Sequence, residues 1–245
     1  SSTADLIQQH ADELACILVE PMQGASGCIP GSTGFLKLLR AASHKIGAIL
    51  IFDEVMTSRL SNRGAQGLFN VIPDMTTLGK YIGGGMTFGA FGGSEAIMQI
   101  FDPRLADAIP HAGTFNNNTL TMAAGVSALG EVLTDELLTQ LNNRGDRLRM
   151  ELNKIAREHE SCIQFTGLGS LLGMHTTSSP IHSTADLKGC DDRIMELVFL
   201  DLLEQGYYIA RRGFIALMLP IADAEIGGFT KAFTAVVKAR GELLN

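Results

Sequence analysis

The 245-residue sequence lacks the features that mark nucleic-acid-binding and membrane proteins. Its 19 lysines and arginines are outnumbered by 26 aspartates and glutamates, the net charge is −7, and the basic residues are not clustered. A nucleic-acid partner is therefore not expected, because binding a phosphate backbone needs concentrated positive charge. No apolar run approaches the roughly 20 residues of a membrane-spanning helix, and the first residues have neither the basic start nor the cleavage site of a secretion signal. We therefore expect a cytoplasmic protein without a membrane partner.

Cysteine and histidine are also scarce. The cysteines stand far apart in the chain, without metal-ligand spacing, and are too few for a disulfide framework: Cys16, Cys28, Cys162 and Cys190. We expect buried or free thiols in a reducing compartment. The six histidines form no HxxxH or HxH pair, so no metal site is predicted.

What is present indicates an α/β protein. The hydrophobic content of 46% and the mean hydropathy of +0.18 supply ample core. The apolar runs at 15–21 and 48–55 predict buried parallel strands, and the helical spacing at 34–47, which ends in glycine, predicts a helix between them. The stretches "MTTLGK" and "FGAFGG" predict two further short strands joined by glycines. This alternation of strand and helix is typical of a mostly parallel sheet.

The second half of the chain has a different pattern. Polar turn formers open the segment 111–133, which continues as a helix of small residues, and a charged helix over 137–159 follows. Beyond it the sequence predicts a strand, a helix, a strand pair and a helix, which is a small α+β domain. We predict that residues 1–140 are part of a large α/β domain and that 141–245 form a linker helix and a small C-terminal domain. The few strands of the first part suggest the C-terminal part of a longer protein.

The stretch "MTTLGKYIGGGMTFGAFGG" places Lys80 before a run of glycines, but it contains no nucleotide motif. A Walker A loop needs a glycine where Asp74 stands and a serine or threonine where Tyr81 stands. A GxGxxG motif starting at Gly83 would need a third glycine at Phe88.

Asp53 and Lys80 together predict a specific chemistry. Asp53 ends an apolar strand, at the edge where open α/β sheets bind ligands, and a carboxylate there needs a cationic partner. Taken alone, Asp53 is equally well explained as a helix cap or as the partner of a structural arginine, and Lys80 as a solvated loop cation. Pyridoxal phosphate, however, needs a lysine amine as nucleophile for its aldehyde and an acidic partner for its ring nitrogen. Two consecutive strand ends could supply both.

Four motifs in order carry a family resemblance: "VEPMQGASGCIP", "ILIFDEVMTSRL", "TTLGKYIGGGMTFGAFGG" and "HAGTFNNNTLTMAAG". The chain resembles the class III pyridoxal-phosphate-dependent aminotransferases over essentially its whole length. It most resembles the branch that holds glutamate-1-semialdehyde 2,1-aminomutase and the bacterial β-phenylalanine aminotransferases. The resemblance implies fold type I of the pyridoxal-phosphate-dependent transferases, with the second half of the large sheet domain and a small α+β domain.

The resemblance also implies roles for five residues. Lys80 would be the catalytic lysine that holds pyridoxal phosphate as a Schiff base, Asp53 would bind the pyridine nitrogen, and Val55 would pack against the ring. Thr114 would donate to the cofactor phosphate from the other subunit of a homodimer, although taken alone it is better explained as a helix-start hydroxyl. Arg212 in "ARRGF" would bind the carboxylate of the substrate or co-substrate, because arginine offers a planar fork; the alternative is that it covers a domain interface.

Some residues depart from the family pattern. Asn118-Thr119 replaces the usual Asn-Pro, and Ala25 stands where many ω-amino-acid aminotransferases carry the glutamate that masks the substrate arginine. The segment "YYIARRGFIALMLP" differs from the aminomutases and is closer to the β-phenylalanine aminotransferases. The family's N-terminal part, with its phosphate-binding turn and ring-stacking aromatic, is not expected within these 245 residues.

The predicted activity is a transaminase that moves an amino group from a β-amino acid to a 2-oxo acid. The alternatives are a glutamate-1-semialdehyde 2,1-aminomutase, which uses the same lysine without a separate acceptor, and a non-catalytic fragment or pseudo-enzyme. The glycines Gly83 to Gly85 are expected to let the backbone turn sharply beside Lys80.

Overall fold

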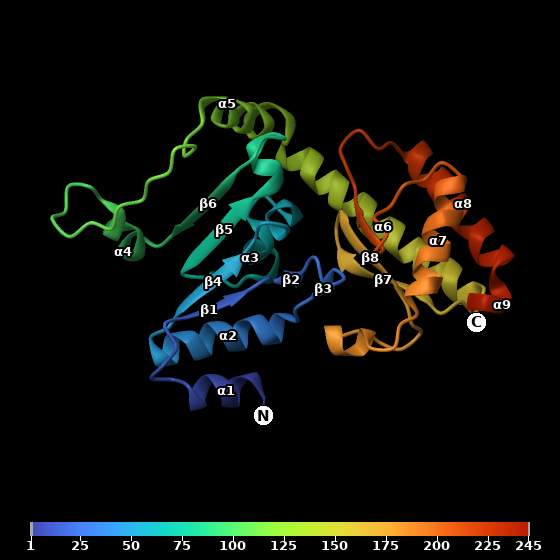
Figure 1. The fold of residues 1–245 in the computed structure, drawn as a ribbon, viewed down its shortest axis with the longest axis horizontal. Helices are drawn as coiled ribbons and strands as arrows, with labels where there is room; N and C mark the ends of the chain where they lie inside the picture. The colour runs from blue at the N-terminus through green and yellow to red at the C-terminus, as the bar shows by residue number, and fades with distance from the viewer. Residues whose placement is uncertain (1, 245) are drawn as a thin grey trace. The chain divides into compact units, whose positions relative to one another are not determined.

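The computed structural model describes residues 2–244, which fold as two compact units. The first unit comprises Ser1–Pro21 and Ser32–Asp135, and the second comprises Met22–Gly31 and Glu136–Asn245. Each unit has its own sheet and its own hydrophobic core (Figure 1). Nothing in the local composition marks the ten residues from Met22 to Gly31 as belonging with the second half of the chain.

The sheet of the first unit has four strands in the order β1-β4-β5-β6. The strands are β1 (Cys16–Val19), β4 (Ile49–Asp53), β5 (Met75–Gly79) and β6 (Gly89–Gly93). β1, β4 and β5 are parallel, and β6 is antiparallel to β5. The helices of this unit are α1 (Thr3–Gln9), α2 (Thr33–Ile46), α3 (Gly64–Phe69), α4 (Glu95–Met98) and α5 (Thr119–Ser127), and α5 continues as a π-helical turn over Ala128–Val132. Short 3-10 turns lie at Thr57–Leu60 (η1), Lys80–Gly83 (η2) and Gln99–Phe101 (η3). The predicted α/β architecture with a mostly parallel sheet is confirmed.

Helix α2 covers one face of this sheet, as its sequence predicts. The Ser32 side chain accepts a hydrogen bond from the Phe35 amide at the start, and Gly47, with φ of 71°, ends the helix in the left-handed region. The core of the unit joins α1 and α2 to β4 and the segment after α3: Ile7, Leu36, Leu39, Leu50, Phe52 and Val71. Leu50 and Phe52 point into this core, so the alternation along β4 directs Ile51 and Asp53 to the opposite face.

The first strand was predicted to be parallel and buried; the parallel pairing with β4 is confirmed, but within the described residues the strand is not buried on both faces. β1 is the edge strand of the sheet, and α2 covers only the face of Ile17 and Val19. On the other face Cys16 is exposed and Leu18 is 63% exposed. The periodicity of a continuous apolar run cannot tell an edge strand from a central one.

Within the described residues, the second unit has a two-stranded hairpin, a three-stranded sheet and four helices. β2 (Met22–Gln23) pairs with β3 (Ile29–Pro30), and β7 (Ile163–Leu168), β8 (Leu171–Thr176) and β9 (Phe214–Ala216) form the antiparallel sheet. The helices are α6 (Asp135–Glu158), α7 (Asp192–Glu204), α8 (Asp223–Ala239) and α9 (Gly241–Leu244), with a 3-10 turn, η5, at Thr184–Leu187.

The predicted order of elements in this unit needs one correction. The strand pair lies in 163–176, where a turn at Gly169, with φ of 53°, folds the segment into the β7–β8 hairpin. The later segment, predicted as a strand pair, contributes only β9. Gly213, with φ of 82°, leaves the extended region just before that strand, so Arg211 and Arg212 lie in a turn.

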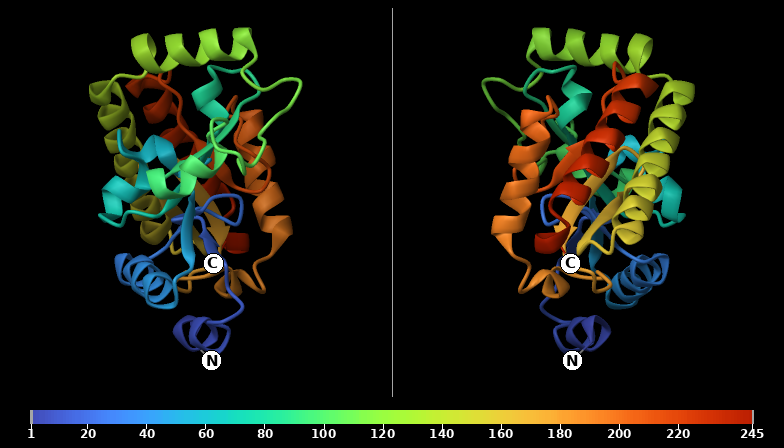
Figure 2. Two further views of the ribbon diagram at one scale, coloured as in Figure 1. Left: turned by 90° about the vertical axis from the view of Figure 1, so that its left-hand side faces the viewer. Right: turned by 90° about the vertical axis from the view of Figure 1, so that its right-hand side faces the viewer.

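Helices α6, α7 and α8 pack on one face of the three-stranded sheet (Figure 2). The strand residues in this core include Phe165, Leu172, Met174 and Ile215. Phe165 and Phe233 meet edge to face, with ring centroids 5.3 Å apart. None of the helices in the described part of the chain is long and apolar enough to cross a membrane.

Candidate active site

Asp53 is the last residue of β4, and its carboxylate is oriented by two local donors. In the β4–β5 register Asp53 is opposite Thr77, so both side chains lie on the face away from α2. The Val55 amide donates to Asp53 Oδ1 at 3.0 Å, and Thr77 Oγ1 donates to the same atom at 3.2 Å. Within residues 2–244 no basic side chain forms an ion pair with Asp53, and Oδ2 accepts no hydrogen bond. Asp53 is therefore not the partner of a structural arginine, and Oδ2 can accept from a ligand.

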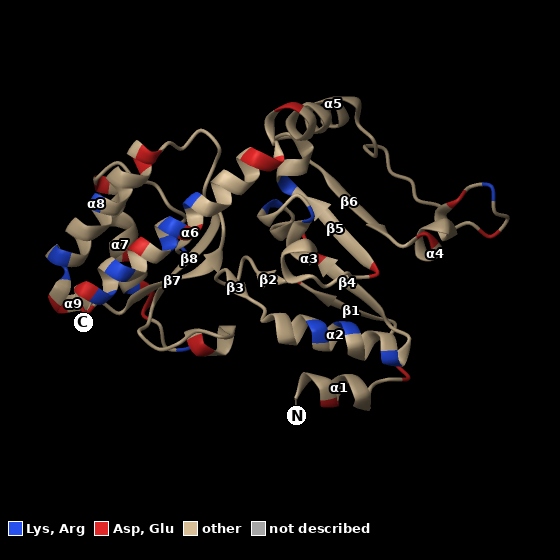
Figure 3. Ribbon diagram, turned by 180° about the vertical axis from the view of Figure 1, so that it is seen from behind, with Lys and Arg blue, Asp and Glu red and all other residues tan. Residues whose placement is uncertain are grey.

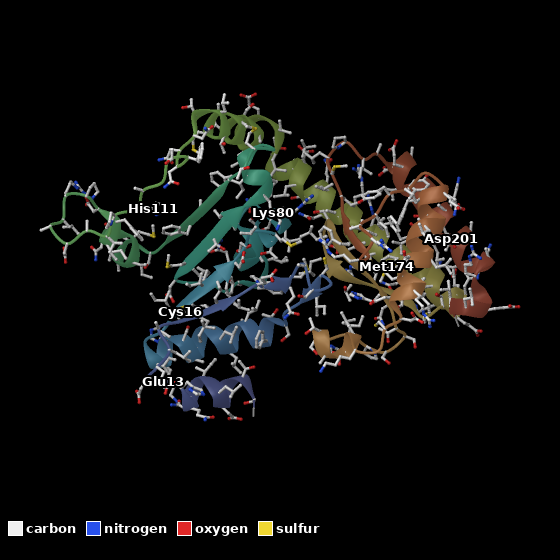
Figure 4. The ribbon with its side chains drawn as sticks, viewed as in Figure 1. Glu13, Cys16, Lys80, His111, Met174 and Asp201 are labelled. Carbon is white, nitrogen blue, oxygen red and sulfur yellow. The ribbon has the colours of Figure 1, made fainter. Side chains whose placement is uncertain are left out.

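Lys80 follows β5 directly and begins the η2 turn, as its label in Figure 4 shows. Its φ of 54° lies in the left-handed region, which is uncommon for a residue with a side chain. Lys80 is the only charged residue between Asp74 and Glu95. Its side chain is exposed, so the residues described here do not desolvate the amine. Burial raises the pKa of the next residue, Tyr81, so this phenol is neutral at physiological pH.

The ends of β4 and β5 contact each other beside Lys80. A Cβ added to Gly79 would lie 3.5 Å from Val55 Cγ1, so Val55 lies directly against the residue that precedes the lysine. Asp53, Val55 and Lys80 thus belong to two adjacent strand ends, which is the arrangement that the sequence predicts.

The glycine run turns sharply after Lys80, as expected. Gly84 and Gly85 have φ of 60° and 92°. A Cβ on Gly84 would lie only 2.3 Å from the Ala124 carbonyl oxygen, so the run also lets α5 approach η2 closely.

The strands and the helix around the glycine run are uncharged. Charged residues are concentrated on helices such as α2 and α6, and β5, β6 and α5 contain no charged residue (Figure 3).

Glu54, beside Asp53 in sequence, has a structural role that the sequence does not predict. Its side chain is fully buried. Four donors satisfy its carboxylate: Thr57 Oγ1 at 3.1 Å, the Ala65 amide at 2.6 Å, the Gln66 amide at 3.0 Å and Gln66 Nε2 at 3.2 Å. The side-chain Nε2 of Gln66 also donates to Thr76 Oγ1 at 3.2 Å. Glu54, which follows Asp53 at the end of β4, is therefore hydrogen-bonded to the start of α3, and Gln66 of α3 is bonded to β5.

Thr114 lies in an exposed turn at 114–117 and does not cap a helix. The cap of α5 is Asn118, whose Oδ1 accepts from the amides of Leu120 and Thr121 at 3.1 and 3.3 Å. The alternative explanation of Thr114 as a helix-start hydroxyl is therefore wrong. Its hydroxyl makes no hydrogen bond within the described residues.

An open cavity of about 1250 Å³ lies over β5 and β6 in the first unit. Phe91, Phe101 and His111 form an aromatic cluster in its wall, with ring centroids 5.2 to 6.1 Å apart. Thr77, the partner of Asp53, also lines it, so the cavity begins at the Asp53 network.

Arg212, in the second unit, is exposed, and its guanidinium carbon lies 5.3 Å from the centroid of the Phe214 ring. Its neighbour Arg211 is paired with Glu196. Arg212 forms no ion pair within residues 2–244. Of the two consecutive arginines, Arg212 is therefore the one available to an anionic ligand, and stacking on Phe214 orients its fork.

The sequence matches the family model described as Aminotransferase class-III over residues 1–237. The chain belongs to the class-III aminotransferases. Among curated relatives, it is 47% identical to a β-phenylalanine transaminase of Variovorax paradoxus over 238 residues, which are 97% of this chain and 55% of that protein. It is 39% identical to a glutamate-1-semialdehyde 2,1-aminomutase of Limosilactobacillus reuteri over 240 residues, which cover 95% of this chain and 55% of the relative.

Solved structures agree with this assignment. A β-phenylalanine aminotransferase from Variovorax paradoxus is 46% identical and has a TM-score of 0.96, over 98% of this chain and 56% of that one. A structure described as a transaminase with PLP bound is 31% identical, with a TM-score of 0.86 over 97% of this chain and 56% of that one. This class-III chain thus spans about half the length of the relatives it matches.

Class-III aminotransferases use pyridoxal phosphate, and the described residues fit that cofactor. Asp53 Oδ2, free of internal donors, suits a protonated ring nitrogen, because Thr77 and the Val55 amide already hold Oδ1. An exposed lysine amine lies at the adjacent strand end. Thr77 was missed because "TT" does not reveal which threonine faces the site, and only the register with Asp53 decides it.

His175 is a buried histidine of this aminotransferase chain that the sequence did not single out. It is 6% exposed on β8, and its Nε2 donates to the Gly27 carbonyl oxygen at 2.9 Å. Thr166 Oγ1 donates to the same oxygen at 2.6 Å and lies 2.8 Å from His175 Nε2. Burial lowers the pKa of His175, although the contact with Gly27 opposes this effect. His175 and Gly27 are 148 positions apart, so no local sequence pattern could reveal the contact.

The free energy of unfolding is expected to fall as the pH drops below about 6.5, the ordinary pKa of histidine. Because the folded pKa of His175 is lowered, the unfolded chain binds a proton in a pH range where the folded chain does not. The stability that depends on neutral His175 is therefore complete above the unfolded pKa and is lost as the pH falls through the folded pKa. Urea unfolding of the protein and of His175→Gln across this range measures the difference, and equal pH dependence in both would contradict the prediction.

Proposed function

We propose that the protein is a pyridoxal-phosphate-dependent aminotransferase that moves an amino group from a β-amino acid to a 2-oxo acid, as a homodimer in the cytoplasm. The observation that carries the proposal is the pair of adjacent strand ends that presents Asp53, with Oδ2 free of internal donors, beside an exposed Lys80. The β-amino donor is supported by the 47% identity to a β-phenylalanine transaminase.

The bound cofactor supplies an electron sink next to the amino-bearing carbon of the substrate. Asp53 Oδ2 holds the proton on the ring nitrogen by charge-assisted hydrogen bonding, and Thr77 keeps the carboxylate in the orientation that this requires. Val55 packs against the ring from the end of β4. Lys80 Nζ would hold the cofactor and would move the proton of the amino-bearing carbon of the substrate.

Arg212 binds the carboxylate of the amino acid or the 2-oxo acid through its two-pronged guanidinium. Stacking on Phe214 restricts the guanidinium plane, and no internal carboxylate in the described part of the chain competes for it. The Thr114 hydroxyl, which has no internal partner among these residues, would donate to the cofactor phosphate of a second subunit, and this supports the homodimer.

The test is reduction with borohydride in the presence of pyridoxal phosphate, followed by peptide mass spectrometry. We expect the phosphopyridoxyl group on Lys80 and on no other lysine, and we expect amino transfer from β-phenylalanine to require an added 2-oxo acid. Turnover of glutamate-1-semialdehyde without any acceptor would instead support the aminomutase. Absence of the modified Lys80 peptide from the protein would show that the proposal is wrong.

A further inference from the structure

Three residues of the second unit line up across its sheet, on the face opposite to the helices. The strand registers place Thr166 opposite Gly173 and Gly173 opposite Phe214. Directly opposite residues of antiparallel strands share a face, with Cβ atoms about 5 Å apart. The neighbouring residues Leu172 and Met174 belong to the helical core, and Met174 is labelled in Figure 4. This row and His175 therefore lie on the other face of the sheet.

The turn between β2 and β3, residues 24–28, sits on this row. A Cβ on Gly173 would lie only 2.3 Å from the Gly27 carbonyl oxygen, so glycine is needed there for the turn to approach. The same oxygen accepts the hydrogen bonds of Thr166 Oγ1 and His175 Nε2. We call Thr166, Gly173 and His175 the Gly27 clamp.

Arg212 lies on the same sheet face as the turn. Its guanidinium stacks on Phe214, which is the direct cross-strand neighbour of Gly173. The Met174 amide donates to the Gly213 carbonyl oxygen at 2.9 Å, which fixes the arginine turn to β8. One strand, β8, therefore holds both the Gly27 turn and the Arg212 turn.

The tip of the Gly27 turn offers donors for an anion. Ala25 and Ser26 are exposed, and their amides make no hydrogen bond within residues 2–244, whereas the amides of Gly27 and Cys28 bond to the Gly24 carbonyl. Two free amides and the Ser26 hydroxyl suit a carboxylate oxygen. Ala25 places no charged side chain there that would compete for Arg212.

We propose that Thr166 and His175 are positioning residues for substrate binding. Through the Gly27 carbonyl they hold the 24–28 turn in place, and the substrate carboxylate binds between this turn and Arg212. The inference rests on the proposed aminotransferase function and deepens it. Neither residue touches the substrate; each acts through the Gly27 carbonyl. Loosening the turn leaves Arg212 in place but removes the surface that closes the site around the carboxylate, so binding weakens while the chemistry at Lys80 is unaffected.

The experiment compares Thr166→Val and His175→Leu, which cannot donate to Gly27, with Thr166→Ser and His175→Gln, which can. Thr230→Val is the control, because it removes a buried threonine whose Oγ1 bonds only to Ile226 within α8. We expect Thr166→Val and His175→Leu to raise KM for the 2-oxo acid about fivefold, as for loss of one hydrogen bond, with kcat nearly unchanged. The Ser and Gln variants should restore KM.

Alkylation of Cys28 by iodoacetamide reports the turn independently of turnover. Cys28 is fully buried within the turn, whereas Cys16 is exposed and serves as an internal reference. We expect several-fold faster alkylation of Cys28 in Thr166→Val and His175→Leu, and no change in Thr230→Val.

The outcomes separate the two proposals. If the unsubstituted protein does not transfer amino groups, the proposed function fails and the assignment to a substrate site fails with it. If it is active but the clamp variants keep their KM, whether or not Cys28 becomes reactive, the positioning role alone is overturned. An equal rise in KM for Thr230→Val would also overturn it, because the effect would then follow stability.

Discussion

Replacing Lys80 with alanine is expected to lower kcat/KM for amino transfer by about 10³-fold or more, because the substitution removes both the covalent attachment point and the proton-transferring amine. The free energy of unfolding should change little, since Lys80 is exposed and its amine forms no ion pair within residues 2–244. Steady-state rates with β-phenylalanine and a 2-oxo acid measure the loss.

Lys45→Ala is the matched control. Lys45 is an exposed lysine of the same unit whose amine donates to Gln8 Oε1 at 2.8 Å, and its loss should leave the rates unchanged. Activity of Lys80→Ala close to that of an active Lys45→Ala would remove Lys80 from the mechanism. No activity in either protein would leave the non-catalytic alternative.

Replacing Glu54 with alanine is expected to lower the free energy of unfolding by about 3–5 kcal/mol, a large part of the 5–15 kcal/mol of a typical domain. The substitution leaves buried donors of Thr57, Ala65 and Gln66 without their acceptor and opens a cavity at the start of α3. Urea unfolding measures the change.

Glu13→Ala provides the comparison for Glu54. Glu13 is 76% exposed at its side chain and pairs only with His10, so its loss should change the unfolding free energy by about 0.5 kcal/mol or less. Glu54→Gln should fall between the two, because it keeps one acceptor oxygen but turns an amide toward the donors. A Glu54→Ala protein as stable as Glu13→Ala would mean that the network makes no net contribution.

Residues whose proposed role depends on local sequence could be predicted from the sequence. Asp53 ends β4 and Lys80 directly follows β5, and a charged residue at the end of a strand can be recognised from neighbouring residues in the sequence. Arg212 was predicted by resemblance, and its availability to a ligand follows from the structure, in which Arg211 is bound to Glu196.

Residues whose role depends on register or on long-range contact were missed. Thr76 and Thr77 are indistinguishable in sequence, yet one faces Gln66 and the other faces Asp53. The pairing of His175 with Gly27 spans 148 positions and gives no local signal. The strand pair was predicted near β9 but lies in 163–176 for a similar reason. Both segments contain a glycine with positive φ, Gly169 and Gly213, and only tertiary context decides which one joins two strands.

With the role proposed for Lys80, its left-handed backbone implies a compromise between stability and function. A non-glycine residue with φ near 54° is disfavoured by on the order of 1 kcal/mol, and glycine would relieve that strain. Selection for stability alone would therefore favour glycine at this position, beside a segment that already contains several. A lysine kept in a conformation that suits glycine better is the pattern expected where a chain gives up folding free energy for the use of one amine.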